Sequence, residues 1–314
     1  MTIAWVLGGG GLLGSAIRRT LQKNKIELFT QPVAFNWNSE FILADQLRQL
    51  VKNFFLLINE ENDWQIYWAA GIGNLSSSEN ELAIETKALE LLIKFLKIEL
   101  ELNNSRGCFI LASSAGAIYA GVSVKLINEN TPIAPTTIYA YEKIKQEDMI
   151  KEFAFLFNKV SALILRISTL YGPGQSFGKR QGLISLMARR MLVNQPIQIF
   201  VPLDTIRDYI FSDEAADLII ATVHLIAGHS GTFLKIVASE EPTTIATIIS
   251  NFRKISRHSP RVISSTNNSS YIYSRQMQFR SIIYPVRDKI SRTILLVGIA
   301  RVFAYEKTAY IRSK

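Results

Sequence analysis

The chain opens on the stretch TIAWVLGGGGLLG, residues 2–14, and this stretch decides the fold. Its apolar run Thr2–Leu7 is typical of a buried parallel strand, and Leu12–Gln22 has the composition of a helix. Glycines between them allow a tight turn, a close approach of the backbone to a pyrophosphate and close packing of the helix on the strand. Free N–H groups at the start of such a helix attract phosphate. We therefore predict that a dinucleotide is bound by Gly8, Gly11, Leu12, Leu13 and Gly14.

Strands and helices continue to alternate beyond the glycine turn. Further strands are predicted at Ile26–Phe29, Gln65–Trp68, Cys108–Leu111, Ala162–Leu165, Tyr209–Phe211 and Phe233–Val237. Helices are predicted at Glu79–Leu102, Ala140–Phe157, Asp213–Ala227 and Thr243–Ile255. This order predicts an α/β fold with a Rossmann-like, doubly wound parallel sheet. We assign residues 1–170 to an NAD(P)-binding Rossmann domain and residues 171–314 mainly to a smaller substrate-binding lobe, with residues 205–230 returning to the first domain.

The composition excludes several classes of protein. The chain has 314 residues, of which 48% are hydrophobic, a net charge of +9 and one cysteine, Cys108. The hydrophobic share excludes a disordered chain, and a single cysteine excludes an internal disulfide and a cysteine-based zinc site. Apolar runs fall short of the roughly 20 residues of a membrane span, and the glycine turn interrupts the first of them. We expect a cytoplasmic protein with no metal site and no membrane span.

Positive charge is concentrated in residues 251–314, which hold 13 Lys or Arg against two acids. A basic segment attracts nucleic acid, anionic lipid or a phosphorylated small molecule. Neither a zinc-finger spacing nor an aromatic RNA-binding motif accompanies the charge, so we expect no nucleic-acid partner. A solvated surface with scattered cations explains the segment equally well.

The end of the second strand bears on the choice of coenzyme. An acid at this place usually holds the adenosine ribose hydroxyls of NAD. Here the strand runs into FTQP, residues 29–32, and Glu27 lies too early in it. Arg18 or Arg19 on the first helix could instead serve the 2′-phosphate of NADP, although both could equally be solvated helix charges. The prediction is therefore NAD or NADP.

A tyrosine and a lysine near the start of a predicted helix are candidates for acid/base chemistry. Tyr139 and Lys143 are four residues apart, which puts both side chains on one helix face. An ammonium group stabilises a phenolate and lowers the pKa of the phenol. Tyr141 and Lys145 repeat the spacing on a different face. Ser114 follows a strand at its carboxyl edge, where open α/β sheets bind ligands, and is placed to hydrogen-bond a substrate oxygen.

The motifs together resemble the extended short-chain dehydrogenase/reductase family, which contains the nucleotide-sugar epimerases and dehydratases. The resemblance spans roughly residues 3–220 and rests on an ordered series. The series is Gly8-x-x-Gly11-x-x-Gly14, Ala69-Ala70-Gly71, Ser113-Ser114 with Tyr119, Tyr139-x-x-x-Lys143 with Glu147, Arg166 through Tyr171-Gly172-Pro173-Gly174, and Arg207-Asp208-Tyr209.

The resemblance implies roles for single residues. Tyr139 would be the catalytic acid/base, Lys143 would lower its pKa and hold the nicotinamide ribose, and Ser114 would position the reacting oxygen. Arg207 would bind a substrate diphosphate, because its planar guanidinium pairs with phosphate oxygens. Further coenzyme-binding residues would be Ala69, Ala70 and Gly71, and further substrate-binding residues would be Thr169 and Gln181.

Departures from the family pattern narrow the range of reactions that we expect. Thr169 stands where the family commonly has asparagine, and Gln181-Gly182 replaces another asparagine, so recognition of the nucleotide sugar is altered. Ala115-Gly116 follows Ser114 in place of an Asp-Glu pair, which argues against a 4,6-dehydratase. The three histidines and Cys108 lie away from the positions needed for epimerisation at two carbons.

Hydride chemistry at one carbon remains. The leading expectation is an NAD(P)-dependent epimerase acting at C4 of a UDP-sugar through a keto intermediate. The alternatives are an NADPH-dependent nucleotide-sugar keto-reductase and a non-catalytic NAD(P)-binding sensor. By family analogy we expect a homodimer through the helices Glu79–Leu102 and Ala140–Phe157. Their apolar stripe would then be buried between subunits, although an ordinary core face explains it equally well. The stripe consists of Leu89, Leu92, Phe95 and Leu96.

Overall fold

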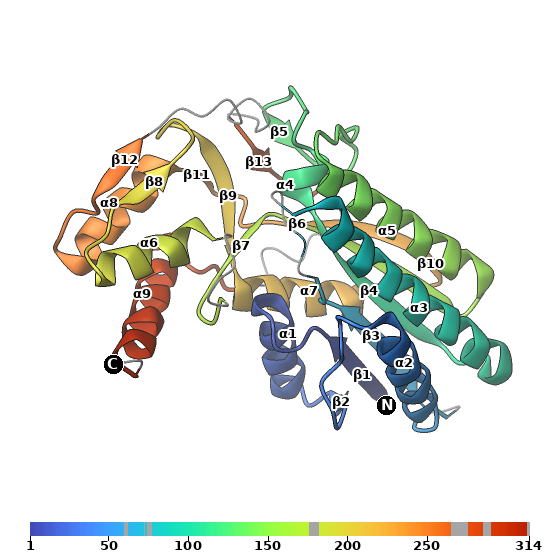
Figure 1. Cartoon of the computed structure of the whole chain (residues 1–314). Coiled ribbons are helices and arrows are strands. Elements are labelled where there is room, and N and C mark those ends of the chain that lie inside the picture. The colour runs from blue at the N-terminus through green and yellow to red at the C-terminus, as the bar shows by residue number, and fades with distance from the viewer. Residues whose placement is uncertain are drawn as a thin grey trace.

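The larger part of the molecule is a layered α/β unit, and a smaller lobe lies beside it (Figure 1). The computed structural model describes residues 1–59, 62–71, 73, 77–175, 182–264, 276–284 and 290–312. In these ranges no helix is long and apolar enough to cross a membrane.

A six-stranded sheet forms the centre of the larger unit, and all its neighbouring strands run parallel. Its strand order is β10-β6-β4-β3-β1-β2. The strands are β1 (Thr2–Leu7), β2 (Glu27–Phe29), β3 (Asp63–Trp68), β4 (Gly107–Ser114), β6 (Val160–Ile167) and β10 (Gly231–Val237). The chain moves outward from β1 in both directions, to β2 on one side and to β3 on the other. Ligands of open α/β sheets bind at the carboxyl ends of the strands at such a reversal.

Helices cover both faces of this sheet, as the nearly continuous apolar runs of its strands require. One face packs on α1 (Leu12–Lys23) and α7 (Ser212–Ile226), in a core around Ile17, Leu163 and Ile219. The other packs on α2 (Glu40–Phe55), α3 (Glu79–Asn103) and α5 (Ile138–Leu156). Figure 1 shows α3 and α5 running side by side, and the two helices are in contact.

The smaller lobe is built from short strands and three helices. Its elements are β7 (Thr169–Tyr171), α6 (Leu183–Leu192), β8 (Ile197–Ile199), β9 (Ile206–Phe211), β11 (Pro242–Thr244), α8 (Ile245–Ser256), β12 (Val262–Ser264) and α9 (Leu295–Arg312). They form the sheets β11-β9-β7 and β12-β8. The remaining elements are the short helix α4 (Ala115–Ile118) and the strands β5 (Leu126–Ile127) and β13 (Gln278–Phe279), which pair with each other.

The doubly wound α/β fold predicted from the sequence is confirmed, and the differences lie in single elements. The helices α2, α4, α6 and α9 were not predicted. The helix expected from Thr243 begins at Ile245, because Thr243 is still paired with Arg207 in the β11-β9 ladder. Both α7 and β10 belong to the Rossmann-like layer, although they follow the first strands of the smaller lobe in sequence.

Candidate active site

The glycine turn between β1 and α1 is packed too closely for side chains at two of its positions. Gly8 has φ +82°, and a Cβ there would lie 2.5 Å from the backbone nitrogen of Ala70 and 2.6 Å from the carbonyl of Ala69. A Cβ on Gly14 would lie 2.2 Å from the carbonyl oxygen of Gly8. The N–H of Gly11 donates to that same oxygen at 2.9 Å. The turn therefore has the close-approach geometry that a bound pyrophosphate needs.

The first N–H groups of α1 are not capped by a side chain. Gly11 is its N-cap and supplies no side-chain hydrogen bond, and the first turn contains no acid. The first N–H groups of such a helix are suited to phosphate. The side chain of Leu13 is buried in the core, so only its backbone is available to a ligand. Leu12 lies beside Gly172, where a Cβ would come within 3.3 Å of its side chain. The residues present thus fit the phosphates of a dinucleotide.

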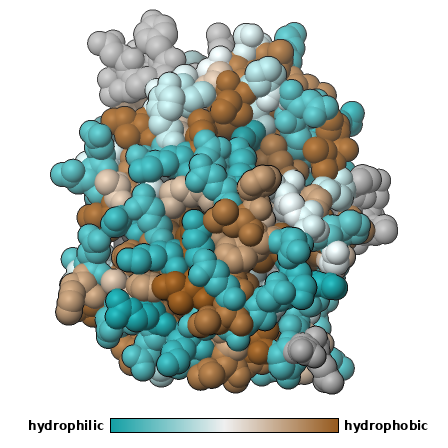
Figure 2. Space-filling model, turned by 90° about the vertical axis from the view of Figure 1, so that its right-hand side faces the viewer, coloured by the Kyte–Doolittle hydropathy of each residue, from teal (hydrophilic) through white to brown (hydrophobic). Residues whose placement is uncertain are grey.

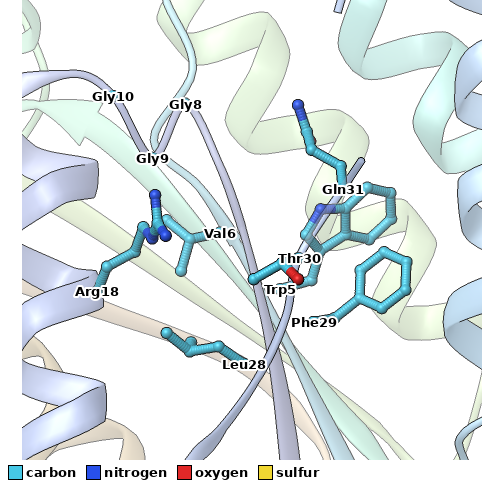
Figure 3. Close-up of a pocket in the computed structure, with 10 residues that line it drawn as sticks. All are labelled: Trp5, Val6, Gly8, Gly9, Gly10, Arg18, Leu28, Phe29, Thr30 and Gln31. Carbon is cyan, nitrogen blue, oxygen red and sulfur yellow. The ribbon is translucent and has the colours of Figure 1, made fainter. Parts of the chain in front are cut away.

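A cleft of about 150 Å³ lies between the glycine turn and the end of β2 (Figure 3). Such a volume holds one part of a dinucleotide rather than all of it. The lining residues are Trp5, Val6, Gly8, Gly9, Gly10, Arg18, Leu28, Phe29, Thr30 and Gln31. The structure separates the two arginines of α1, because Arg18 lines this cleft while Arg19 forms an ion pair with Asp213 of α7.

Ser114, Tyr139 and Lys143 come together at the carboxyl edge of the sheet. Ser114 is the last residue of β4 and caps α4, accepting the N–H of Ala117 at 3.4 Å. Tyr139 and Lys143 lie in the first turns of α5, which begins after the N-cap Thr137. The Ser114 side chain lies near enough to the Tyr139 phenol to lower its pKa, and the Lys143 Nζ lies 5.8 Å from the centre of the Tyr139 ring.

The second Tyr-x-x-x-Lys pair points elsewhere. Tyr141 is 60% exposed, and the Lys145 ammonium lies 3.8 Å from Glu90 at the surface. The structure therefore selects Tyr139 and Lys143 over Tyr141 and Lys145 as the pair beside Ser114.

A buried acid that the sequence analysis missed lies next to this trio. The Lys143 ammonium donates to Oε1 of Glu85 at 2.7 Å and to Gln146 at 3.0 Å, and both members of the ion pair are buried. The other oxygen of Glu85 accepts the N–H of Gly73 at 3.0 Å. A carboxylate at a core position of α3 was the available signal, since Glu85 stands in line with Leu82 and Leu89.

The ion pair keeps both partners charged. Although burial alone would raise the pKa of Glu85, Lys143 lowers it below its ordinary value. Although burial alone would lower the pKa of Lys143, Glu85 raises it above its ordinary value. A permanently charged ammonium thus faces the phenol of Tyr139.

The phenol itself is harder to ionise than the sequence analysis suggested. Burial raises the pKa of Tyr139 above its ordinary value, and Glu85 raises it further. Lys143 lowers the pKa, as predicted, and so does Ser114. The effect of burial outweighs theirs.

A second buried network fixes the helix that carries Tyr139. The Arg166 guanidinium donates to both carboxylate oxygens of Glu147, at 2.7 and 3.0 Å, and to the hydroxyl of Tyr119 at 2.7 Å. The Ser113 hydroxyl donates to Glu147 at 2.6 Å. These paired bonds join α5 to β4 and β6 and so set the position of the helix over the sheet edge.

The expected substrate residues lie in the sheet β11-β9-β7 of the smaller lobe. Thr169 begins β7 and is paired with Tyr209 of β9. Arg207, two residues earlier on β9, is partly buried and donates to the carbonyl of Ile206 at 2.8 Å. Gln181 lies outside the described residues. Their roles toward a substrate stay predictions.

Comparisons with known proteins agree with this geometry. The NAD dependent epimerase/dehydratase family matches residues 4–232 of the chain. The "Putative UDP-glucose 4-epimerase" of Methanocaldococcus jannaschii is 29% identical over 219 residues, which cover 67% of this chain and 70% of that protein. The dTDP-4-dehydro-6-deoxyglucose reductase of Escherichia coli is 25% identical over 261 residues, which cover 78% of each.

A solved structure shows the same fold over the whole length. The UDP-glucose 4-epimerase of Thermotoga maritima, crystallised with UDP-glucose, superposes with a TM-score of 0.78 at 19% identity, covering 99% of this chain and 100% of that one. The match to the family covers most of the chain and includes the glycine turn, Ser114, Tyr139 and Lys143. The chain therefore belongs to the NAD dependent epimerase/dehydratase family and is an enzyme of the extended short-chain dehydrogenase/reductase type that depends on an NAD-type dinucleotide.

Proposed function

We propose that the protein is a 4-epimerase of a UDP-sugar, which inverts C4 through a transient keto intermediate. The observation that carries the proposal is the proximity of Ser114, Tyr139 and the charged Lys143, on the sheet edge that also holds the glycine turn. This is the arrangement of a general acid/base with an activating cation.

Each of the three residues has a separate task in this proposal. Tyr139 takes the proton of the C4 hydroxyl and later returns it to the same oxygen. Ser114 hydrogen-bonds the reacting oxygen and holds it against the phenol. Lys143 stabilises the phenolate electrostatically while Glu85 keeps the ammonium charged and in place. A bound nicotinamide dinucleotide would supply the site that accepts and returns the hydride. Residues Gly8, Gly11, Leu12, Leu13, Gly14, Ala69, Ala70 and Gly71 would hold that dinucleotide.

Two further residues would bind the substrate. We assign Arg207 to the diphosphate and Thr169 to the nucleotide sugar, because they lie on neighbouring strands of the smaller lobe. Relatives support a nucleotide sugar as the substrate class. The M. jannaschii relative carries the name of a UDP-glucose 4-epimerase, and the T. maritima enzyme was crystallised with UDP-glucose.

A keto-reductase is the second candidate. The E. coli relative that covers 78% of this chain is a reductase of a dTDP-linked 4-keto sugar. The same Ser114, Tyr139 and Lys143 would then donate a proton to the C4 oxygen as hydride arrives. The two reactions would differ in the source of the hydride delivered to C4. In the epimerase it would have left the same sugar earlier in the turnover, whereas in the reductase it would come from NADPH that is consumed.

An assay of coenzyme balance separates the two. Purified protein is incubated with UDP-glucose and, separately, with UDP-galactose, and the sugar nucleotides are analysed by proton NMR while absorbance at the nicotinamide band is followed. Interconversion of the two sugars without net change in coenzyme supports the epimerase. Turnover of a 4-keto sugar nucleotide that consumes NADPH in equal amount, without such interconversion, would instead establish the reductase.

Substitution of the phenol tests the catalytic assignment. Tyr139→Phe removes the group that carries the proton, so we expect turnover to fall by about 100-fold or more while dinucleotide binding is kept. Tyr141→Phe, two residues along the same helix at an exposed position, is the matched control and should keep wild-type activity. Full activity in Tyr139→Phe would contradict the assignment and leave a non-catalytic binding role for the trio.

We further propose that the enzyme works in the cytoplasm as a homodimer. The stripe expected at the subunit interface does not face outward, because Leu89, Leu92, Phe95 and Leu96 are all buried in the chain's own core. A dimer through these two helices would use their outer faces instead.

A further inference from the structure

The adenosine end of the dinucleotide site has an unusual charge. The cleft of Figure 3 lies where the chain passes from β1 into the glycine turn, beside the end of β2. None of its ten lining residues is an acid. The two vicinal hydroxyls of an NAD ribose are hydrogen-bond donors, and a carboxylate at the end of this strand is what usually accepts them. After Phe29 the lining offers only the neutral side chains of Thr30 and Gln31.

Arg18 is the cation of this cleft. A Cβ built on Gly9 would lie 2.8 Å from the Cδ of Arg18 and 3.6 Å from its Nη1, so the guanidinium stem lies directly across the glycine turn. Figure 3 shows the Arg18 side chain rising from α1 toward Gly9 and Val6, at the cleft. Across the described ranges Arg18 forms no hydrogen bond or ion pair, and its side chain is exposed.

The adjacent arginine differs in each of these respects. Arg19 is tied to Asp213 of α7, on the side of α1 that faces that helix, and it does not line the cleft. Of these two neighbouring arginines, Arg19 has a charged partner and Arg18 has none within the described ranges. Arg18 is left available to an anion, whereas the charge of Arg19 is already matched.

We propose that Arg18 binds the 2′-phosphate of an adenosine ribose, so that this chain takes NADP(H) in preference to NAD(H). The inference rests on the proposed function only in assigning the glycine turn to a dinucleotide. A guanidinium offers two parallel N–H donors to phosphate oxygens, and such charge-assisted bonds are among the stronger ones in proteins. The acid that would repel a 2′-phosphate is missing from the cleft lining.

Coenzyme choice and reaction are separate properties of this site. An epimerase returns the hydride, so a 2′-phosphate on the coenzyme changes its affinity and not the overall balance. The preference is therefore a property of the adenosine cleft and can be measured without any sugar nucleotide.

A pair of half-coenzymes isolates the 2′-phosphate. The full chain, freed of bound nucleotide, is titrated calorimetrically with adenosine 2′,5′-bisphosphate and with adenosine 5′-monophosphate. We expect the wild type to bind the bisphosphate about tenfold more tightly, the effect of one charged hydrogen-bonding partner. Arg18→Gln should remove this preference and leave the affinity for the monophosphate unchanged. Arg19→Gln is the matched control and should keep the wild-type preference.

A gain-of-function variant tests the same cleft from the other side. Thr30→Asp places an acid at the exposed end of β2. We expect this acid to weaken the binding of adenosine 2′,5′-bisphosphate and to shift the preference toward adenosine 5′-monophosphate. Equal or tighter binding of the monophosphate by the wild type would overturn the proposal, as would equal losses in the Arg18 and Arg19 variants or failure of both ligands to bind. Epimerisation of UDP-sugars together with a monophosphate preference would refute this inference alone. A bisphosphate preference without sugar turnover would refute the proposed function alone.

Discussion

Glu85 determines the electrostatic environment of Lys143. Its carboxylate holds the Lys143 ammonium at 2.7 Å in a buried pair, and its second oxygen is bonded to the backbone of Gly73. This arrangement keeps the cation in position, yet the same negative charge raises the pKa of Tyr139. The residue thus stabilises the catalytic cation while it opposes ionisation of the phenol.

Glu85→Gln should therefore move the pH dependence of catalysis. The base form of Tyr139 is the phenolate, so a higher pKa of this group moves the acid limb of the activity profile to higher pH. Removing a charge that raises this pKa should move the limb to lower pH. We expect the acid limb of the kcat/KM profile to shift to lower pH. Steady-state kinetics across the pH range with a saturating coenzyme measure the shift.

The neighbouring Glu90 provides the control for this variant. Glu90→Gln is the same substitution on the same helix, but Glu90 forms ion pairs at the surface with Lys87 and Lys145, so its profile should match the wild type. Glu85→Gln should also lower the free energy of unfolding in urea by about 3 kcal/mol, because a buried ammonium loses its counter-charge. An unchanged acid limb, or one shifted to higher pH, would rule out the electrostatic role.

At the residue scale the sequence predicted the members of the trio but not their charge environment. The order of Ser114, Tyr139 and Lys143 along the chain followed a known series, and the structure brings them together. The contact between Glu85 and Lys143 joins residues 58 positions apart. Local spacing carries no information about the burial of the phenol or about such a pair, so the rise in the pKa of Tyr139 could not be foreseen.

At the scale of elements, the glycine turn and α1 pack so closely that there is no room for a side chain at Gly14. A Cβ on Gly14 would overlap the backbone of Gly8 and Gly9, at 2.2 to 2.9 Å, and backbone atoms have little freedom to move aside. We expect Gly14→Ala to weaken dinucleotide binding by at least about tenfold and to destabilise the fold by about 1–3 kcal/mol. Fluorescence titration with the dinucleotide and urea unfolding measure the two effects.

Gly10→Ala is the matched control for this prediction. It lies in the same turn, but a Cβ at that position would meet nothing within 4 Å, and its φ does not lie in the left-handed region. Its stability should therefore stay close to the wild type. If Gly14→Ala unfolded at the same urea midpoint as Gly10→Ala, close packing of Gly14 would not be what shapes the turn.

The elements differ in how far local sequence specifies them. The central strands carry long apolar runs, and these were predicted within a few residues. Helix α2 was missed although Leu43, Leu47, Leu50 and Phe54 follow a helical spacing behind the N-cap Ser39. The strands β8 and β12 have three residues each, and Ile197 pairs with Val262. A strand of three residues is too short to show an alternation of apolar and polar residues. It is defined by the strand it pairs with and not by its own sequence.

On the scale of the whole molecule, the smaller lobe is attached at the edge of the sheet that carries Ser114, Tyr139 and Lys143. The chain leaves the Rossmann-like layer after β6, returns through α7 and β10, and leaves it again into β11. Buried Asp208 ties these crossings together, accepting the hydroxyl of Ser168 at 2.5 Å and the N–H and hydroxyl of Ser239 at 2.9 Å. A lobe anchored in this way can hold a substrate against Tyr139 without a flexible linker.

The outer face of α3 and α5 is the surface through which we propose that two subunits associate. Phe155 of α5 is 91% exposed, and Ile84, Ile98 and Tyr141 on the two helices are about half exposed or more. Figure 2 shows apolar side chains in small groups among polar ones on the side of the molecule toward which these helices lie in Figure 1. Around its buried centre, a stable protein–protein interface shows a similar mixture of apolar and polar side chains.

A two-fold symmetric dimer uses the same face on both subunits, so a single substitution there acts twice. We expect sedimentation equilibrium of the wild type to give twice the 35.4 kDa of one chain. Phe155→Glu places a buried charge on each side of the interface and should yield the single-chain mass with the unfolding midpoint of the folded subunit retained. Phe41→Glu, an equally drastic change at an 85% exposed phenylalanine of α2, should leave the dimer intact. A wild type of 35.4 kDa, or dissociation by both variants alike, would remove this face from the assembly.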